Sequence, residues 1–179
     1  NAGGNPGQDL QELGYRVLIV KGKPADPNQR YGIEVDQNGA RVVAGDAYKG
    51  LWNYAACEKL YEKYPETASF ITIGPAGEMK MAAASVAFTD MELRPTRHAG
   101  RGGVGAVMGA KNVKAIVLDD AGTQMRAPKD IEKFREANKK WVEGLKKHPV
   151  TGQGLPAFGT NVLTNILNEV GGYPTNNVT

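Results

Sequence analysis

Glycine constrains the folding of this chain more than any other residue type. The stretch RHAGRGGVGAVMGAKN, residues 97–112, contains five glycines within ten positions, and the 179-residue chain contains 23 in all. That share is close to twice the usual value of about 7%. Serine and proline are not enriched alongside the glycines, as they are in flexible linkers. Because glycines in defined turns let the backbone approach another group closely, we expect a folded loop here that packs against protein or against a ligand.

Charge and cysteine content exclude several classes of protein. The net charge of +3 is spread over interleaved acidic and basic residues, which argues against a nucleic-acid surface. No apolar stretch is long enough to span a membrane, and the start of the chain lacks the form of a secretory signal. The single cysteine, Cys57, excludes internal disulfides and any cysteine-held cluster built from this chain alone. We therefore expect a cytoplasmic protein without nucleic-acid or membrane partners.

Apolar and β-branched runs predict a sheet in the first two thirds of the chain. The Asn38-Gly39 pair between two such runs is the strongest short-range signal for a β-hairpin. The predicted strands are Tyr15–Lys21, Tyr31–Asp36, Ala40–Ala44, Ser69–Ile73, Met81–Phe88 and Val113–Leu118. This part of the chain is therefore expected to be mainly antiparallel sheet.

Apolar residues at helical spacing predict the helices. They are expected at Pro6–Leu13, Leu51–Tyr64, Val104–Ala110, Lys129–Lys147 (with Pro128 in its first turn) and Phe158–Val170. Between the last strand and the last two helices, Ala121–Pro128 has no hydrophobic period, which is typical of a linker. The predicted fold class is α+β: a mainly antiparallel N-terminal domain, residues 1–122, followed by helices of an incomplete all-α domain, residues 123–179.

The glycine stretch imitates a dinucleotide-binding motif. Gly100, Gly102 and Gly105 spell G-x-G-x-x-G, and two aspartates follow about twenty residues later. That motif requires a buried parallel strand directly before its first glycine, whereas residues 90–99 are polar and broken by Pro95. A phosphate loop of the nucleoside-triphosphatase type also fails, since the spacing is wrong and no serine or threonine follows the lysine.

The local chemistry is that of an anion site. The glycines leave the backbone here without covering side chains, and it is flanked by Arg97, His98 and Arg101. Basic side chains of this kind bind anions through charge-assisted hydrogen bonds. One alternative is that the glycines only permit tight packing of a helix on a strand, with the arginines in solvent. Another is a non-catalytic anion- or nucleotide-binding module that uses the loop Gly100–Gly105.

The remaining reactive side chains give weaker hypotheses. Cys57 lies on an apolar helical stripe, so a buried hydrophobe is favoured over a reactive thiol. Glu78 follows a glycine turn, where it either caps the turn or orients an arginine of the glycine motif. No pair of carboxylates has a spacing that argues for acid–base work, and we assign no catalytic residue to this chain.

Four segments in order carry a family resemblance. They are NAGG at residues 1–4, GYRVLIVKGK at 14–23, IGPAGE at 73–78 and HAGRGGVGAVMGAKNVKAIV at 98–117. Together they resemble the N-terminal domain of the aldehyde ferredoxin oxidoreductase family, the tungsten enzymes, over nearly all of residues 1–118. The helical part beyond the linker resembles the start of the family's second domain less specifically. The resemblance implies that the chain is a fragment.

The resemblance implies a cofactor and a reaction. Such enzymes hold tungsten, or molybdenum, between two pyranopterins (tungstopterin), with a [4Fe–4S] cluster nearby, and oxidise aldehydes to carboxylic acids with electron transfer to ferredoxin. Residues 1–122 would be the tungstopterin-binding domain, lacking its start, and residues 123–179 the beginning of the helical domain. The cluster cysteines and acid–base residues of the family fall outside this chain, so the fragment alone is expected to be inactive.

The resemblance also implies site residues and partners. Cofactor binding is expected at Asn1, Gly3, His98, Ala99, Arg101 and Gly102, with Mg²⁺ held by the backbone carbonyls of Asn1 and Ala99. The expected partners are ferredoxin or a related electron carrier, an aldehyde substrate and the missing domains of the same protein. A homodimer and a same-family reductase subunit with a different substrate are left open.

Overall fold

The computed structural model describes residues 1–22, 24, 26–124 and 127–177. The chain forms two compact units, Asn1–Met125 and Arg126–Thr179, which are described separately. The predicted linker over residues 121–128 includes residues 125 and 126, and the predicted strand segment GYRVLIVKGK ends on residue 23; these three residues lie outside the described part.

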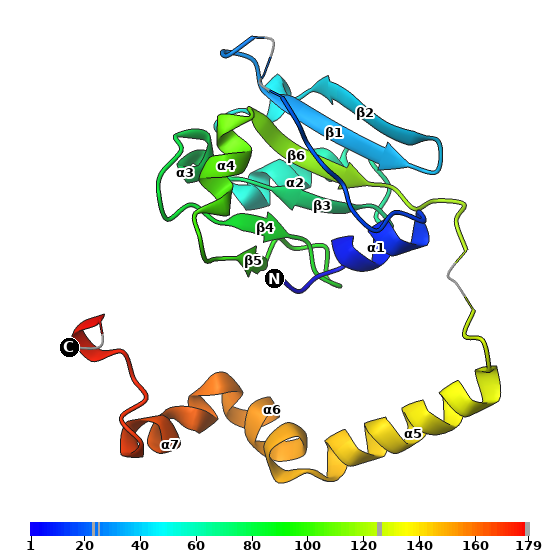
Figure 1. The fold of residues 1–179 in the computed structure, drawn as a ribbon, viewed down its shortest axis with the longest axis vertical. Coiled ribbons are helices and arrows are strands. Elements are labelled where there is room, and N and C mark those ends of the chain that lie inside the picture. Colours follow the sequence, from blue (N-terminus) through cyan, green and yellow to red (C-terminus); the bar gives the residue numbers. More distant parts are fainter. Residues whose placement is uncertain (23, 25, 125–126, 178–179) are drawn as a thin grey trace. The chain divides into compact units, whose positions relative to one another are not determined.

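The first unit is built on one six-stranded sheet with the order β2-β1-β6-β3-β4-β5 (Figure 1). Its strands are β1 (Tyr31–Asp36), β2 (Gly39–Ala44), β3 (Ser69–Thr72), β4 (Val86–Phe88), β5 (Arg97–Ala99) and β6 (Val113–Leu118). Every neighbouring pair is antiparallel except β1 with β6. The predicted α+β class and the mainly antiparallel sheet are confirmed.

The hairpin between β1 and β2 forms where the sequence predicts it. Asp36 pairs with Gly39 at its closed end, and the Asn38 amide donates a 2.7 Å hydrogen bond to Asp36 Oδ1. Gly39 has a φ of +128°, which a residue with a Cβ rarely adopts. The turn is therefore set by Asp36, Asn38 and Gly39, which lie within four positions of the chain.

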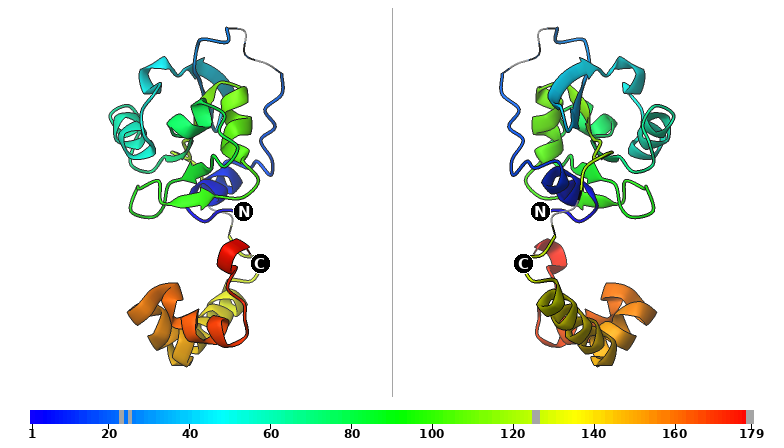
Figure 2. Two further views of the ribbon diagram at one scale, coloured as in Figure 1. Left: turned by 90° about the vertical axis from the view of Figure 1, so that its left-hand side faces the viewer. Right: turned by 90° about the vertical axis from the view of Figure 1, so that its right-hand side faces the viewer.

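Helices cover both faces of the sheet. Helix α2 (Asn53–Tyr61) lies on one side, and α1 (Pro6–Glu12) and α4 (Val104–Ala110) lie on the other (Figure 2). Two further short helices of this unit are α3 (Pro75–Glu78) and the 3₁₀ turn η1 (Asp46–Tyr48). Residues of α2 pack on one apolar cluster of the sheet, and residues of α1 and α4 pack on a second. Because successive strand residues face opposite sides, both faces of the central strands are buried.

Two predicted strands differ from the structure. Tyr15–Lys21 forms no strand: Leu18 and Val20 pack on the sheet, whereas Val17 and Ile19 are 67% and 69% exposed. The segment has the alternating burial of a strand but crosses the face of the sheet, because alternation reports one-sided burial and not backbone pairing.

The second difference is the length of β4. Only Val86–Phe88 of the predicted Met81–Phe88 is a strand. The Met81 amide donates to the Ala76 carbonyl, and the Gly105 amide donates to the Ala84 carbonyl, both at 2.9 Å. The backbone ahead of β4 is therefore bonded to the helical segments of α3 and α4 instead of to a neighbouring strand.

The second unit is helical. Helix α5 (Ile131–Lys147) begins after Asp130, whose Oδ1 accepts a 3.0 Å hydrogen bond from the Lys133 amide. Pro128 therefore precedes the cap instead of lying in the first turn. The remaining elements are a π-helical turn η2 (Val150–Gly154), α6 (Leu155–Phe158), the 3₁₀ turn η3 (Gly159–Leu163), α7 (Thr164–Glu169) and η4 (Thr175–Asn177). The single helix predicted over Phe158–Val170 is wrong, because Gly159 takes a φ of +58° and a ψ of −149°, which no helix contains.

A buried carboxylate lies between α1 and the sheet. Asp9 is 7% exposed, and among the described residues neither its Oδ2 nor the Ser69 Oγ has a hydrogen-bond partner. Burial raises the pKa of Asp9 to about 6 although the nearby Ser69 hydroxyl opposes the shift, and the carboxylates of Asp120 and Glu12 add to the rise. A group held in this way reduces the stability of the fold at neutral pH.

Replacing Asp9 by asparagine is expected to raise the free energy of unfolding near neutral pH. The folded-state pKa of about 6 lies above the ordinary value of 3.8. The folded state therefore binds more protons between these values, and stability falls as pH rises through that range and stays low above it. A shift of about two units corresponds to at most about 3 kcal/mol. Urea denaturation over this pH range should show the decline in the wild type and not in Asp9→Asn.

The exposed Glu66 provides the control, because Glu66→Gln changes the same kind of group without burial. That variant should retain the pH dependence of the wild type. A decline of equal size in Asp9→Asn and in the wild type would show that another group is responsible.

Candidate functional site

The first predicted cofactor segment is fastened to the end of β4. The Asn5 amide donates a 3.0 Å hydrogen bond to the Thr89 carbonyl, and Asn5 Nδ2 donates to the Asp90 carbonyl at 3.4 Å. Gly4 has a φ of +96°, and a Cβ there would lie 2.3 Å from the Thr89 oxygen. Only glycine fits this contact, which fixes the path of residues 1–4.

This path brings the first predicted segment to the second. A Cβ built on Gly3 would lie 3.6 Å from Arg97 Cδ, and Arg97 begins β5. Figure 1 shows the N-terminus beside β5. Asn1 and Gly3 are exposed, so the predicted binding groups of this segment face open space next to β5.

The second segment presents its predicted residues on the edge strand and the loop that follows. His98 and Ala99 belong to β5, where Ala99 pairs with Val86 of β4. Arg101 and Gly102 follow in the loop before α4. Ala99 is half-buried, whereas the His98 and Arg101 side chains are exposed. The six predicted site residues thus lie on two segments that meet at the edge of one sheet.

Three glycines of the stretch are explained by packing within the protein. A Cβ on Gly103 would lie 2.2 Å from the Ala82 oxygen, one on Gly105 2.4 Å from the Ser85 oxygen, and one on Gly109 1.9 Å from the Gly77 oxygen. Real Cβ atoms do not approach backbone oxygens so closely. The packing alternative therefore holds for these three positions, where α4 contacts α3 and the segment before β4.

Gly100 and Gly102, in contrast, are not explained by packing within the protein. A Cβ at either position would meet no described atom within 4 Å. Gly102 needs glycine for its φ of +78°, but Gly100 has neither a positive φ nor a close neighbour. The bare backbone at residues 99–102, with the exposed Arg101 and His98, leaves room for an anionic group to approach main-chain atoms. The residues present therefore fit a phosphate-bearing cofactor.

The geometry differs from a dinucleotide-binding unit. β5 does precede Gly100, but it is a three-residue edge strand in which Arg97 and His98 are exposed. Because β6–β3, β3–β4 and β4–β5 are each antiparallel, β5 and β6 run in opposite directions. A dinucleotide fingerprint needs parallel strands joined by the crossover helix, so α4 does not connect such a pair.

Beside the first segment lies a hollow of about 250 Å³. It is lined by Gly4, Asn5, Gln8, Asp90, Met91, Glu92 and Arg97. Asp90 organises the loop on its far side: Thr96 Oγ1 donates to Asp90 Oδ2 at 2.5 Å, and this bond holds the pKa of Asp90 near 2. The two carboxylates in this lining make Arg97 a less favourable anion ligand than Arg101.

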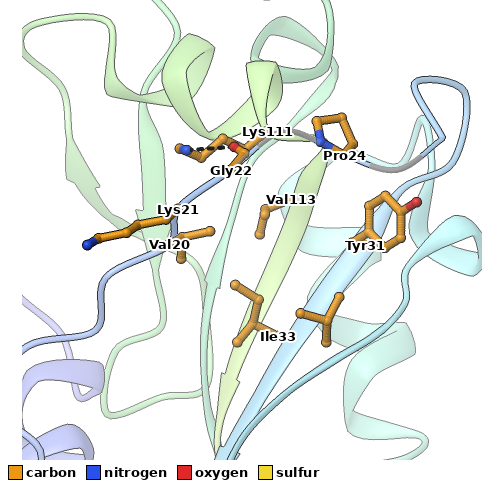
Figure 3. Close-up of a pocket in the computed structure, with 9 residues that line it drawn as sticks. Val20, Lys21, Gly22, Pro24, Tyr31, Ile33, Lys111 and Val113 are labelled. Atoms are coloured by element: carbon orange, nitrogen blue, oxygen red, sulfur yellow. Dashed lines mark hydrogen bonds between the residues drawn. The ribbon is translucent and has the colours of Figure 1, made fainter.

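A second hollow, of about 220 Å³, lies over the other end of the sheet (Figure 3). It is lined by Val20, Lys21, Gly22, Pro24, Tyr31, Ile33, Val42, Lys111 and Val113. Lys111 Nζ closes one side by donating a 3.1 Å hydrogen bond to the Gly22 carbonyl. Its walls are mainly apolar, and it includes none of the residues predicted to bind the cofactor.

A buried ion cluster joins β6 to the end of α3. Lys114 is fully buried and donates to Glu78 Oε1 at 2.5 Å and to the Leu51 carbonyl at 2.7 Å. Arg30 Nε lies 3.5 Å from Glu78 Oε2, and the Gly50 amide donates to the same carboxylate at 3.0 Å. Burial lowers the pKa of Lys114, and Glu78 opposes that shift.

The cluster tests the two hypotheses for Glu78. The carboxylate accepts a hydrogen bond from the Gly50 amide, which is 28 residues away and not part of the glycine turn that Glu78 follows. Its arginine partner is Arg30 and not an arginine of the glycine motif, so that hypothesis is wrong. Sequence reasoning missed Lys114, although a lysine inside the apolar strand VKAIVL is the signal that could have identified it.

The Cys57 thiol belongs to the apolar core. Cys57 is 2% exposed, and burial raises the pKa of its thiol to about 12, which confirms the buried hydrophobe. Among the described residues no three His, Cys, Asp or Glu side chains are placed to hold a metal ion. In the same part of the chain no helix combines the length and apolarity that a bilayer span requires.

Comparisons with known proteins agree on one family. Residues 1–120 match the family described as "Aldehyde ferredoxin oxidoreductase, N-terminal domain". The tungsten-containing aldehyde ferredoxin oxidoreductase of Pyrococcus abyssi is 42% identical over 184 residues, and that of Pyrococcus furiosus is 37% identical over 181. Each alignment covers 99% of this chain and 28% of the relative.

A solved structure is also similar. It is the active-site complex BamBC of benzoyl coenzyme A reductase in complex with 1,5-dienoyl-CoA, with a TM-score of 0.70 and 25% identity. The match covers 81% of this chain and 21% of that chain. The family match extends over the whole sheet and both glycine-bearing segments. The chain therefore belongs to the aldehyde ferredoxin oxidoreductase family, and residues 1–120 are its N-terminal domain.

Proposed function

We propose that this chain is the part of a tungsten- or molybdenum-containing oxidoreductase that holds the phosphates of a bis-pyranopterin cofactor. Residues 1–122 form the tungstopterin-binding domain in this proposal, and residues 123–179 begin a helical domain. The observation that carries it is the meeting of two glycine-bearing segments at β5, where Gly3 lies against Arg97. The whole enzyme oxidises an aldehyde to a carboxylic acid and passes electrons to ferredoxin or a related carrier.

Each predicted residue has a distinct part in binding. Arg101 and His98 donate hydrogen bonds to phosphate oxygens, because both side chains are exposed beside bare backbone. Gly3 and Gly102 let the cofactor approach the main chain. The backbone carbonyls of Asn1 and Ala99 are the oxygen ligands that Mg²⁺ prefers, and a cation there offsets the charge of the phosphates.

In this proposal the residues of this chain position the cofactor. Bound tungstopterin would supply the two-electron chemistry, with a [4Fe–4S] cluster as the next electron carrier. Residues 1–4 and 98–102 fix one side of the cofactor, and the strand pairing of β4 with β5 keeps the two segments in register. Acid–base groups and cluster ligands are assigned to parts of the protein beyond this chain.

A reductase of the same family is the second candidate. The similarity to a benzoyl coenzyme A reductase active-site complex favours it. In that case residues 1–4 and 98–102 bind the cofactor in the same way, while other domains shape a different substrate pocket. Assays of the whole enzyme with aldehydes and with aryl-CoA thioesters separate the two candidates, because only one substrate class should be turned over.

Growth of the whole enzyme with tungstate tests the proposal directly. Purified protein should contain one tungsten and two organic pterins per active site. Bound NAD or another nucleotide without tungsten or molybdenum would instead support the anion- or nucleotide-binding module at Gly100–Gly105.

Replacing Arg101 by alanine in the whole enzyme is expected to lower cofactor occupancy. A charge-assisted hydrogen bond contributes about 1.5–3 kcal/mol, so the affinity for the cofactor should fall by about tenfold to a hundredfold. Far-UV circular dichroism should stay unchanged, because Arg101 is exposed and its side chain supports no described element. The measurements are metal and pterin content at limiting tungstate.

Arg16→Ala is the matched control, because Arg16 is an exposed arginine of the same unit outside both predicted segments. It should leave metal and pterin content unchanged. Full occupancy in Arg101→Ala would remove the role assigned to that side chain.

A further inference from the structure

Ser85 makes a contact that the binding proposal does not use. Its Oγ lies 2.9 Å from His98 Nδ1. Ser85 directly precedes β4, and His98 lies in β5 opposite Ala87. The hydroxyl therefore reaches across the strand pair to one of the two ring nitrogens of a predicted cofactor ligand.

The backbone of Ser85 is fixed by the glycine stretch. A Cβ on Gly105 would lie 2.4 Å from the Ser85 oxygen, and the Gly105 amide donates to the neighbouring Ala84 carbonyl at 2.9 Å. Ser85 is thus held by the first turn of α4, a few residues beyond Arg101. Ser85 therefore contacts both the glycine stretch, through its backbone, and the His98 ring, through its hydroxyl.

The direction of this hydrogen bond and the tautomer of His98 depend on each other, because a hydroxyl can donate to Nδ1 or accept from it. A neutral imidazole has one donor and one acceptor nitrogen, and the partner of one nitrogen determines the state of the other. When the Ser85 hydroxyl donates to Nδ1, the ring hydrogen must lie on Nε2. Nε2 is then a donor, which is the group that a phosphate oxygen requires.

We propose that Ser85 is a positioning residue that fixes His98 in the Nε2–H tautomer, so that Nε2 donates to a phosphate oxygen of the cofactor. The proposal rests on the proposed function for its ligand. The contact that orients the His98 ring, in contrast, lies within the chain.

The chain contains an internal reference for the test. It has two histidines, and the second, His148, accepts a 3.3 Å hydrogen bond from the Val150 amide at its Nδ1. A backbone amide can only donate, so neutral His148 must be the Nε2–H tautomer. Its ¹⁵N shifts therefore calibrate the spectrum in which His98 is read.

The test is long-range ¹H–¹⁵N NMR of the full chain with ¹⁵N-labelled histidine, at a pH where both rings are neutral. In the wild type His98 should give the pattern of His148. In Ser85→Ala it should shift toward a mixture of tautomers, and Ser85→Thr, which keeps the hydroxyl, should restore the wild-type pattern. A wild-type His98 with its hydrogen on Nδ1, or no change in Ser85→Ala, would overturn the proposal.

Titration with inorganic phosphate and Mg²⁺ separates this proposal from the proposed function. Ser85→Ala should raise the dissociation constant for phosphate by about threefold to tenfold, the effect of one neutral hydrogen bond. Arg101→Ala should also weaken binding while leaving the His98 tautomer unchanged. If wild-type chain binds no phosphate although the tautomer responds to Ser85→Ala, the phosphate site fails and the positioning of His98 stands. Unchanged phosphate affinity in Ser85→Ala would overturn the second half of the proposal.

Discussion

Replacing Glu78 by alanine is expected to lower the free energy of unfolding of the first unit by about 3–5 kcal/mol. The variant leaves the fully buried Lys114 ammonium without its counter-ion, and a buried charge without a partner is costly. It also removes the acceptor of the Gly50 amide. Urea denaturation of the full chain, followed by the amide signals of the central strands β3 and β6, measures the change.

The loss should depend on pH. Burial already lowers the pKa of Lys114 below its ordinary value of 10.5, and removing Glu78 lowers it further. The unfolded chain then binds more protons than the folded one over the range between the two pKa values, so the stability of the variant rises with pH there. The deficit relative to the wild type should therefore be largest near neutral pH and shrink in alkaline solution.

Two further variants control this result. Glu78→Gln combined with Lys114→Met removes both charges and keeps an acceptor for Gly50, so it should cost less than Glu78→Ala alone. Glu132→Ala breaks an exposed pair with Arg135, in which the side chains are 79% and 69% exposed, and should change stability by at most about 0.5 kcal/mol. A loss in Glu78→Ala no larger than that in Glu132→Ala would contradict the role of the cluster.

Replacing Gly109 by alanine is expected to destabilise the first unit by about 2 kcal/mol. Helix propensity alone predicts the opposite, a gain of about 1 kcal/mol. A Cβ at Gly109, however, would lie 1.9 Å from the Gly77 oxygen, so α4 must move away from α3, and overpacking of this kind costs about 1–3 kcal/mol or more. Urea denaturation of the full chain measures the sign as well as the size.

The second unit offers the matched control. Gly144 lies inside α5, and a Cβ there would meet no described atom within 4 Å. Gly144→Ala should therefore follow propensity and stabilise its helix, whereas Gly109→Ala should destabilise its own. If both variants were stabilised, the close approach of α4 to α3 would be wrong.

Short-range features of this fold were predictable from the sequence. The hairpin at Asn38-Gly39 and helix α4 depend on residues within one turn of each other, and both appear at their predicted positions. Tyr15–Lys21 could not be predicted correctly in this way, because a strand also needs a partner with free backbone groups. Its alternating residues are compatible with a segment that lies across the sheet.

Long-range contacts were outside the reach of sequence patterns. Glu78 and Lys114 are 36 residues apart, and Arg30 and Glu78 are 48 apart, so no local period relates them. The division of the glycines into packing positions and open positions likewise needs coordinates, since Gly100 and Gly105 look equivalent in the motif. The predicted site residues came from family resemblance, whereas the contact of Ser85 with His98 came from the structure.

The close contacts at Gly4, Gly103, Gly105 and Gly109 are all made with the chain's own backbone. Contacts within the chain therefore determine the path of residues 1–4 and the packing of α4. A preformed site loses little conformational entropy when a ligand binds, so under the proposed function the cofactor would bind an already folded surface without coupled folding. The same proposal separates folding of this domain from the binding of its cofactor, as two successive stages.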